Sequence, residues 1–308
     1  MTLSPHVRAL RPRQWTKNAI VFAAPLFAFD LTPATLLGSS LAFVLFCAIS
    51  SSFYLVNDIV DVNADRLHPI KRHRPIASGQ VKMSTAKVMA AVLLVGGLGL
   101  GWWKAWELGA VLTLYTVLQA AYNLGLKRLV ILDVMAIATG FVLRAVAGAA
   151  AIDIRLSPWF LLCTAFLALF LGIEKRKAEL RLSQLGIGKT RPVLKRYSFL
   201  LLGRMENIVT TGTIMTYAIW SSGPQVEGAP TPWMMLTLPF VLYGLFRYQL
   251  LSDPKIMERP GFKPIPTSDR SERPEEILLS DWPVLLTIVG WILTVCTILG
   301  LYERGVIS

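Results

Sequence analysis

Residues 36–74 read LLGSSLAFVLFCAISSSFYLVNDIVDVNADRLHPIKRHR, a mostly apolar run followed by an acidic segment and then a basic one. No charged side chain interrupts residues 36–57. A run of about 20 apolar residues is long enough to cross a bilayer core about 30 Å thick. The stretch therefore predicts a membrane helix with clustered charges at its end.

The apolar character extends over the whole chain. Hydrophobic residues make up 54% of the 308 residues and charged residues only 16%, whereas soluble domains carry about 25% charged residues. These values predict an all-α, polytopic membrane protein, with one integral-membrane domain over residues 1–308. We expect about nine spans of bilayer length, at residues 18–32, 36–57, 85–103, 107–124, 131–151, 157–174, 199–220, 233–250 and 283–302. The polar stretch 254–282 is predicted to be a loop with a short helix at 275–279.

The sparse cysteines and histidines exclude several kinds of site. Cys47, Cys163 and Cys296 lie far apart in apolar runs and form no CxxC pattern, which excludes a disulfide framework and a zinc ribbon. Three histidines are too few for a histidine-rich metal centre.

The chain carries 31 lysines and arginines against 19 acidic residues, a net charge of +12. The basic residues gather in the N-terminal arm and in alternate loops, at 58–87, 125–130, 175–198 and 247–282, while the opposite loops hold little beyond Lys104, Arg155 and Arg304. The positive-inside rule then predicts a multi-pass protein of the cell (inner) membrane, with a cytoplasmic N-terminus and an external C-terminus. No aromatic-interleaved basic groove is visible, so no nucleic-acid partner is expected.

The acidic segment is the clearest candidate site. Asn57, Asp61 and Asp65 are four residues apart, and Asp58 lies three residues before Asp61, so on a helix these side chains share one face. Clustered hard oxygen ligands suit Mg²⁺. The sequence therefore predicts a magnesium site at the cytoplasmic end of the second span; the alternative is an acidic helix end in solvent.

A basic segment follows the acidic one directly, with Arg66, Lys71, Arg72 and Arg74. Carboxylates for a metal beside cations for phosphate oxygens are the usual pairing for a diphosphate leaving group. We therefore expect the two segments to handle a diphosphate together.

At these residues the chain resembles a known family. NDxxDxxxD followed by DRxHPxKxxRPIASG, over residues 57–79, is similar to the UbiA-type membrane prenyltransferase superfamily. The stretches RPRQWTKN (11–18), LFLGIEKRKAEL (169–180) and EEILLSD (275–281) resemble its decaprenyl-phosphate phosphoribosyltransferase branch. Where ordinary prenyltransferases of the superfamily carry a second aspartate-rich motif after the sixth span, this chain has Glu174, Lys175, Arg176 and Glu179.

The resemblance implies a nine-helix bundle with its active cavity at the cytoplasmic side. It implies a Mg²⁺-dependent pentosyltransferase that moves 5-phosphoribose from 5-phosphoribosyl 1-diphosphate to a long-chain polyprenyl phosphate in the bilayer and releases diphosphate. With it comes an expected role in cell wall biosynthesis; a homo-oligomer is left open. Asn57, Asp58 and Asp61 would then be catalytic, and these three with Asp65 would hold the metal.

The expected substrate-binding residues share a place near the cytoplasmic side. They are Lys17, Arg66, Lys71, Arg72, Arg74, Tyr122, Lys127, Arg128, Arg144, Glu174, Lys175, Arg176 and Glu179. For Lys127 and Arg128 the alternative is an ordinary positive-inside flank, and at the end of the sixth span a basic residue also complements the helix dipole.

Arg144 is expected in the middle of the fifth span, where an arginine costs about 3 kcal/mol or more unless it faces a polar interior. We expect it near the site; the alternative is a carboxylate partner on another helix. The small residues Ala145, Ala147 and Gly148 predict a close helix approach around it. Asp133 is expected either in the site or as a helix cap. The same two alternatives apply to Asp281, which as a cap would have Pro283 just inside the helix.

Two rival functions follow from the same residues. An aromatic prenyltransferase with a polyprenyl diphosphate donor, making a quinone or haem precursor, shares the fold, metal and motif, but the missing second aspartate motif counts against it. A transporter would place its ionisable residues near the membrane midplane, whereas here the acidic cluster lies at one edge.

Overall fold

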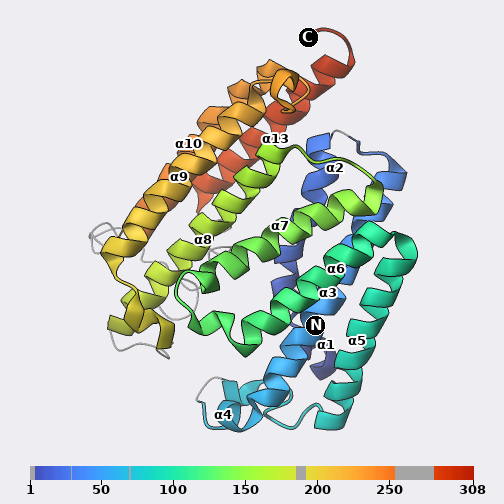
Figure 1. Cartoon of the computed structure of the whole chain (residues 1–308), viewed down its shortest axis with the longest axis vertical. Helices are drawn as coiled ribbons and strands as arrows, with labels where there is room; N and C mark the ends of the chain where they lie inside the picture. Colours follow the sequence, from blue (N-terminus) through green and yellow to red (C-terminus); the bar gives the residue numbers. More distant parts are fainter. Residues whose placement is uncertain (1–3, 29, 69–70, 185–191, 254–280) are drawn as a thin grey trace. The chain divides into compact units, whose positions relative to one another are not determined.

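The computed structural model describes residues 4–28, 30–68, 71–184, 192–253 and 281–308, and these ranges form helices and turns without a β-strand (Figure 1). Six of the described helices are long and apolar enough to cross a membrane. They are α3 (Pro33–Val60), α5 (Met83–Lys104), α7 (Leu132–Ile152), α8 (Pro158–Gln184), the pair η6 and α10 (Pro232–Ser252), and α13 (Trp282–Glu303). The predicted all-α membrane fold is confirmed.

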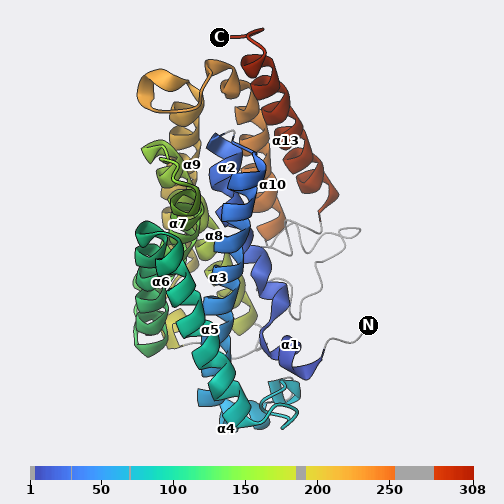
Figure 2. The same ribbon diagram turned by 90° about the vertical axis from the view of Figure 1, so that its right-hand side faces the viewer.

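The first of two compact units comprises Met1–Asn123 and Leu143–Leu156. Besides α3 and α5 it contains α1 (Pro5–Ala9), η1 (Pro12–Phe22), α2 (Ala23–Ala28), α4 (Val62–Arg66), η2 (Lys71–His73), α6 (Trp106–Leu124) and the second half of α7. Helix α3 begins where Thr32 caps it and Pro33 occupies its first turn. Helix α5 runs beside α3, and α4 lies at the end of α3 (Figures 1 and 2).

The core of the first unit is built around α3. Phe46 and Ile49 of α3 pack with Leu112 and Tyr115 of α6, all of them buried. The outward face of α5 exposes Val88, Val92, Val95 and Trp103 instead, which is the pattern of a helix face that meets lipid.

A close contact joins α7 to η1 in this unit. A Cβ atom on Gly148 would lie 2.0 Å from the carbonyl oxygen of Val21, so only glycine permits this approach. Ala145 and Ala147 are fully buried on the same helix. The predicted role of these small residues is therefore confirmed, and it places Arg144, one turn before Gly148, against η1.

The second unit comprises Leu124–Val142 and Ser157–Ser308. It contains η3 (Leu126–Arg128), the first half of α7, α8, η4 (Pro192–Arg196), α9 (Phe199–Ser221), η5 (Pro224–Val226), η6 (Pro232–Thr237), α10 (Leu238–Ser252) and α13. Helix α8 packs along α9, and α10 along α13 (Figure 1). Asp281 caps α13 by accepting a hydrogen bond from the amide of Val284, in agreement with the cap alternative.

The core of this unit brings Phe170, Leu202, Tyr248 and Val284 together from α8, α9, α10 and α13. A Cβ on Gly172 of α8 would lie 2.9 Å from Cγ1 of Val134, so α8 and α7 approach closely there as well.

The expected first span, 18–32, is not among the six described helices long and apolar enough to cross a membrane, so it stays a prediction. The chain forms the 3₁₀-helix η1 and then the short α2, which ends at Ala28. Pro25 has no N–H to donate to the carbonyl of Val21 four residues earlier, and that carbonyl faces Gly148 instead. The expected spans 107–124 and 199–220 form the helices α6 and α9. Neither is among the six described helices long and apolar enough to cross a membrane, so the count of nine spans stays a prediction. The expected helix at 275–279 lies outside the described residues.

Candidate functional site

The acidic segment bridges the end of α3 and the start of α4. Helix α3 ends at Val60, and Asp61 stands between the two helices with φ −89° and ψ 6°. The helical hydrogen-bond spacing persists, because the amide of Asp61 donates to the carbonyl of Asn57 (2.9 Å) and the amide of Asp65 donates to that of Asp61 (2.8 Å). Asp58 and Asp65 are buried, Asn57 is half-buried and Asp61 is exposed. The four side chains therefore meet different surroundings.

The two buried carboxylates converge on one guanidinium group. The Nη1 atom of Arg74 lies 3.0 Å from Oδ1 of Asp58 and 2.6 Å from Oδ2 of Asp65. Arg11 forms a second ion pair with Asp58 and stacks over the ring of Tyr54, 5.1 Å from its centroid. The acidic segment and the basic segment thus contact each other through Arg74.

Arg11 reaches the site from the N-terminal arm, where it has a left-handed φ of 56° just before η1. A backbone contact before Arg11 and a side-chain contact after it join the arm to α3. Ser51 donates a hydrogen bond to the carbonyl of Leu10 (2.9 Å), and the indole of Trp15 donates to Oγ of Ser51 (3.1 Å). Arg8 extends the contact to the basic loop, donating to the carbonyl of His73 and to the side chain of Gln80.

The carboxylates of Asp58 and Asp65 are chemically suited to a hard cation, and their positions fit such an ion only in part. Carboxylate oxygens are the ligands that Mg²⁺ prefers, and Asp58 and Asp65 already converge on a single cationic nitrogen of Arg74. Within the described part of the chain, however, no three His, Cys, Asp or Glu residues are grouped closely enough to hold a metal ion. A metal at this point would therefore take the place of a guanidinium nitrogen.

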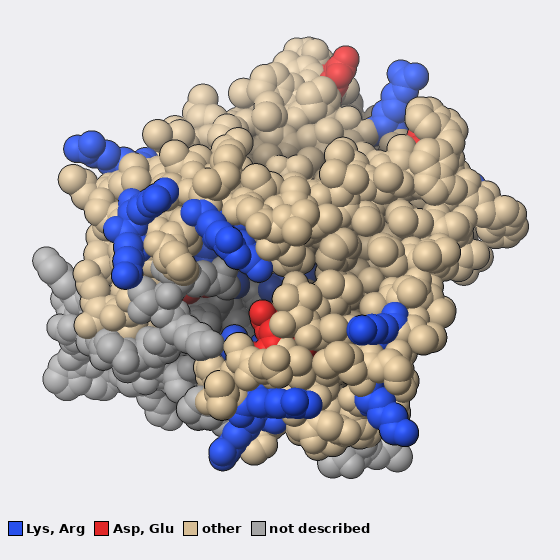
Figure 3. Space-filling model, turned by 60° about the horizontal axis from the view of Figure 1, so that its bottom comes forward, with Lys and Arg blue, Asp and Glu red and all other residues tan. Residues whose placement is uncertain are grey.

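The other predicted cations of the first unit surround this cluster less tightly. Arg66 donates to the carbonyl of Ala77 at 3.3 Å, and exposed Arg72 donates to the ring of His73. Lys71 in η2 and Lys17 in η1 are half-buried. The space-filling view with the bottom of the molecule brought forward shows Lys and Arg side chains standing out at several places on the described surface, and acidic side chains at fewer places (Figure 3). Tyr122 lies near the end of α6 and is half-buried.

Arg144 is buried in the first unit, where it contacts polar and aromatic side chains. Its Nε donates to Oδ1 of Asn18 and its Nη2 to the hydroxyl of Tyr115, both at 2.7 Å. Its guanidinium also lies over the rings of Tyr115 and Phe46. Because Asn18 belongs to η1, Arg144 fixes the same arm that presents Arg11.

In the second unit, Arg176 is enclosed by a polar network. Its side chain is 0% exposed, and it binds Asp133 (Nε to Oδ2, 2.7 Å) and Glu179 (Nη1 to Oε2, 2.5 Å). The hydroxyl of Tyr197 donates to Oδ1 of Asp133 at 2.7 Å and accepts from the amide of Ile131. The cap alternative for Asp133 is wrong, because α7 begins at Leu132 and the Asp133 carboxylate binds Arg176 and Tyr197.

Glu174 belongs to a second network in the same unit. Lys177 lies 2.9 Å from Oε1 of Glu174 and forms an ion pair with Glu206 of α9 as well. Gln249 of α10 donates to Oε1 of Glu206 at 2.9 Å. Lys175 on α8 is half-buried. The predicted Lys127 and Arg128 lie in η3, the first half-buried and the second exposed.

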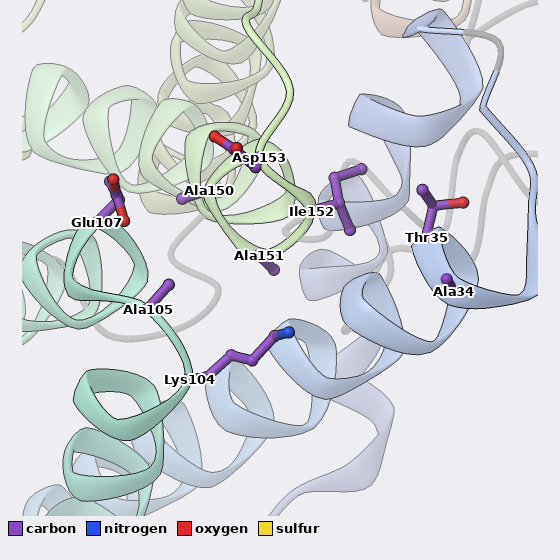
Figure 4. Close-up of a pocket in the computed structure, with 9 residues that line it drawn as sticks. All are labelled: Ala34, Thr35, Lys104, Ala105, Glu107, Ala150, Ala151, Ile152 and Asp153. Carbon is purple, nitrogen blue, oxygen red and sulfur yellow. The ribbon is translucent and has the colours of Figure 1, made fainter.

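A cavity of about 460 Å³ opens at the other end of the first unit (Figure 4). It is lined by the start of α3, the junction of α5 and α6, and the end of α7, with Thr35, Lys104, Glu107 and Asp153 as its polar residues. None of the residues predicted for the site lines it, so it is separate from the acidic segment.

Sequence reasoning missed several residues that the structure brings into these clusters. Arg11 and Asn18 lie in the stretch 11–18 that carries the family resemblance, but neither was singled out. The left-handed backbone conformation of Arg11 has no signal in the sequence other than the following Pro12. Tyr197 and Glu206 were also missed, because their partners lie on other helices. Lys177 was missed although one of its two partners, Glu174, lies three residues before it on α8.

Comparisons with known proteins identify the family. The profile of the UbiA prenyltransferase family matches residues 19–258. A decaprenyl-phosphate phosphoribosyltransferase of Mycolicibacterium smegmatis is 36% identical over 303 residues, covering 94% of this chain and 90% of the relative. Its counterpart from Corynebacterium glutamicum is 35% identical, covering 96% of this chain and 86% of the relative.

The fold agrees with a solved structure of this type. A UbiA homolog from Archaeoglobus fulgidus, bound to DMAPP and Mg²⁺, superimposes with a TM-score of 0.66 at 18% identity, covering 96% of this chain and 99% of that one. Together with the profile match over most of the chain, this places the protein: it belongs to the UbiA prenyltransferase family.

Proposed function

We propose that this protein transfers 5-phosphoribose from 5-phosphoribosyl 1-diphosphate to a long-chain polyprenyl phosphate in the membrane and releases diphosphate. The observation that carries the proposal is the similarity to decaprenyl-phosphate phosphoribosyltransferases over 94% and 96% of the chain. It makes the protein a membrane pentosyltransferase rather than a prenyltransferase that alkylates an aromatic ring.

The chemistry needs a site that binds several phosphate groups. The donor carries a diphosphate and a 5-phosphate, and the acceptor carries another phosphate. The first unit supplies oxygen ligands in Asp58, Asp61 and Asp65, and it supplies cations in the basic segment folded against them. Arg66, Lys71 and Arg72 are the cations that we assign to the donor phosphates.

In the reaction, an oxygen of the lipid phosphate attacks C1 of the ribose. The bond between C1 and the diphosphate oxygen breaks, and its electron pair leaves with diphosphate, so C1 passes through an oxocarbenium-like state. The lipid phosphate is already an anion near neutral pH, so no general base is needed. Mg²⁺ held by Asp58, Asp61 and Asp65 with Asn57 would neutralise charge on the leaving diphosphate.

The site faces the cytoplasm in this proposal. The donor is a water-soluble sugar phosphate, and the basic residues that predict the cytoplasmic side include the segment next to Asp58 and Asp65. A multi-pass protein with this orientation meets the donor from the cytosol and the acceptor from the bilayer.

The test is a transfer assay with purified full-length protein in liposomes that contain polyprenyl phosphate. With labelled 5-phosphoribosyl 1-diphosphate and Mg²⁺, we expect a labelled lipid-linked pentose phosphate. Asp61→Asn should lower the rate about 100-fold or more, in the range seen when a group that stabilises transition-state charge is removed. Asp61 is exposed, so its replacement breaks no buried ion pair; Glu303→Gln, at the exposed end of α13, is the matched control.

A different product would refute the proposal. If no lipid-linked pentose phosphate forms while a polyprenyl diphosphate alkylates an aromatic acceptor, the protein is an aromatic prenyltransferase. Full transfer activity in Asp61→Asn would refute the assignment of Asp61 to the metal.

A further inference from the structure

We infer that Arg11 and Arg74 form a latch on Asp58 and Asp65 that couples the binding of the metal ion to the binding of diphosphate. The inference rests on the proposed function only in that it concerns diphosphate, which is the leaving group for either donor class. Its physical basis is an ion-pair cluster with two positive and two negative side chains, in which the carboxylates are buried (3% and 4% exposed) and the arginines are more open (30% and 26%).

A metal ion alone meets an unfavourable site. The carboxylates of Asp58 and Asp65 are already engaged by cations, and Nη1 of Arg74 stands where both carboxylates converge. To bind there, a divalent cation must displace at least one guanidinium, which then has no anion to bind. Two cations competing for the same carboxylates keep the metal affinity low.

Diphosphate alone meets the opposite difficulty. Its oxygens suit the planar fork of an arginine better than any other side chain. Drawing Arg11 and Arg74 away, however, leaves the nearly buried Asp58 and Asp65 without compensating charge, and breaking a buried pair by removing one partner is strongly unfavourable. Each ligand alone therefore has to break ion pairs of the cluster without replacing all of them.

The two ligands together complete an exchange of partners. Each arginine gives up a carboxylate and gains a phosphate oxygen, while each carboxylate gives up an arginine and gains the metal. No buried charge is left unpaired at the end. Such a shared dependence is a coupling free energy between two ligands, and measured couplings change an affinity by about 5- to 150-fold.

The local structure permits this exchange through side chains alone. Ser51 of α3 binds the Leu10 carbonyl before Arg11 and the Trp15 indole after it, which holds this arm against α3. Arg11 and Arg74 are each about a quarter exposed or more, so an incoming phosphate can reach them. A rotation of the two side chains is enough to open the latch.

The test measures binding without catalysis. Full-length protein in detergent is titrated calorimetrically with Mg²⁺ alone, and then with preformed magnesium pyrophosphate. Arg11→Gln is expected to bind Mg²⁺ alone about fivefold more tightly than the wild type, because a competing cation is gone, and to bind magnesium pyrophosphate about fivefold more weakly. Arg13→Gln, on the same arm but exposed, is the matched control and should change neither affinity.

The opposite changes expected in Mg²⁺ affinity and pyrophosphate affinity distinguish the latch from a purely structural role of Arg11. Mg²⁺ affinity that is unchanged or weaker in Arg11→Gln, at a wild-type melting temperature, overturns the inference. If Arg11→Gln melts early, Arg11→Lys replaces it: a lysine keeps the competing charge but lacks the fork, so Mg²⁺ affinity should stay low while pyrophosphate affinity falls. Wild-type pyrophosphate affinity in Arg11→Lys then overturns it. A protein that shows these shifts but transfers no phosphoribose would refute the proposed function and leave the latch standing.

Discussion

The Nε atom of Arg144 donates a 2.7 Å hydrogen bond to Oδ1 of Asn18 and so ties the buried half of α7 to η1. A second donor of Arg144 binds the hydroxyl of Tyr115 at the same distance. The arm that presents Arg11 to Asp58 therefore depends on an arginine far along the chain.

Arg144→Ala should destabilise the protein by about 2–4 kcal/mol, because it leaves a cavity and strands the buried side chain of Asn18 without its donor. Thermal unfolding in detergent measures the loss. Arg155→Ala, at an exposed arginine just beyond α7, is the control and should melt like the wild type. An Arg144→Ala protein as stable as Arg155→Ala would contradict the structural role.

Gly148→Ala should also loosen the arm, since its Cβ would lie 2.0 Å from the backbone carbonyl oxygen of Val21, which cannot move aside as a side chain can. We expect a lower melting temperature and a lower transferase rate. Gly99→Ala on α5 is the matched control: a Cβ there meets nothing within 4 Å, so the change should be neutral or stabilising within about 1 kcal/mol. Equal melting temperatures for the two variants would contradict the close contact.

The features predicted correctly from the sequence are those set by neighbouring residues. The spacing of apolar residues gave α3, α5, α7 and α8 to within a few residues at most ends, except that α8 continues beyond the expected 174 to Gln184. Helix α8 continues past the apolar run because its charged residues there are paired, as Arg176 is with Glu179 inside the unit. The cap at Asp281 needed only local chemistry as well.

The features that could not be predicted depend on contacts distant in sequence. Asp58 and Arg11 are 47 positions apart, and nothing in either segment specifies how η1 crosses α3. The single face expected for the acidic segment came from the helical repeat alone, which does not show that Asp58 and Asp65 are buried while Asp61 is exposed. Asp133 was weighed as a cap because its partners, Arg176 and Tyr197, belong to other elements.

The hydroxyl of Tyr197 predicts a pH dependence. Burial, and its hydrogen bond to the Asp133 carboxylate, raise the pKa of Tyr197 above its ordinary value of about 10. The folded state therefore holds this proton more tightly than the unfolded state, so the stabilisation is complete below about pH 10 and is lost as the pH rises above it.

Tyr197→Phe should lower stability by about 1 kcal/mol at neutral pH through the lost hydrogen bonds. The difference in melting temperature between wild type and variant should then shrink above about pH 10. Thermal unfolding at a series of pH values measures it. A difference that grows with pH would contradict the direction of the shift. Tyr302→Phe, near the exposed end of α13, should show no such trend.

Lys177 separates two carboxylates in the second unit, because it lies 2.9 Å from Glu174 and also pairs with Glu206. Both glutamates are buried. Lys177→Met leaves them facing each other without this cation, and removing one partner from a buried pair costs about 3–5 kcal/mol. A clear fall in melting temperature is expected, whereas Lys195→Met, at an exposed position of η4, should have little effect.

The double variant Lys177→Met/Glu206→Gln decides whether charge is the cause. Replacing Glu206 by the isosteric glutamine removes the like-charge repulsion and keeps an acceptor for the amide of Gln249, which binds Glu206 at 2.9 Å. The double variant should therefore melt above the single Lys177→Met variant, a positive coupling in a double-mutant cycle. If the two losses simply add, Lys177 stabilises the junction of α8 and α9 by packing rather than by neutralising the two glutamates.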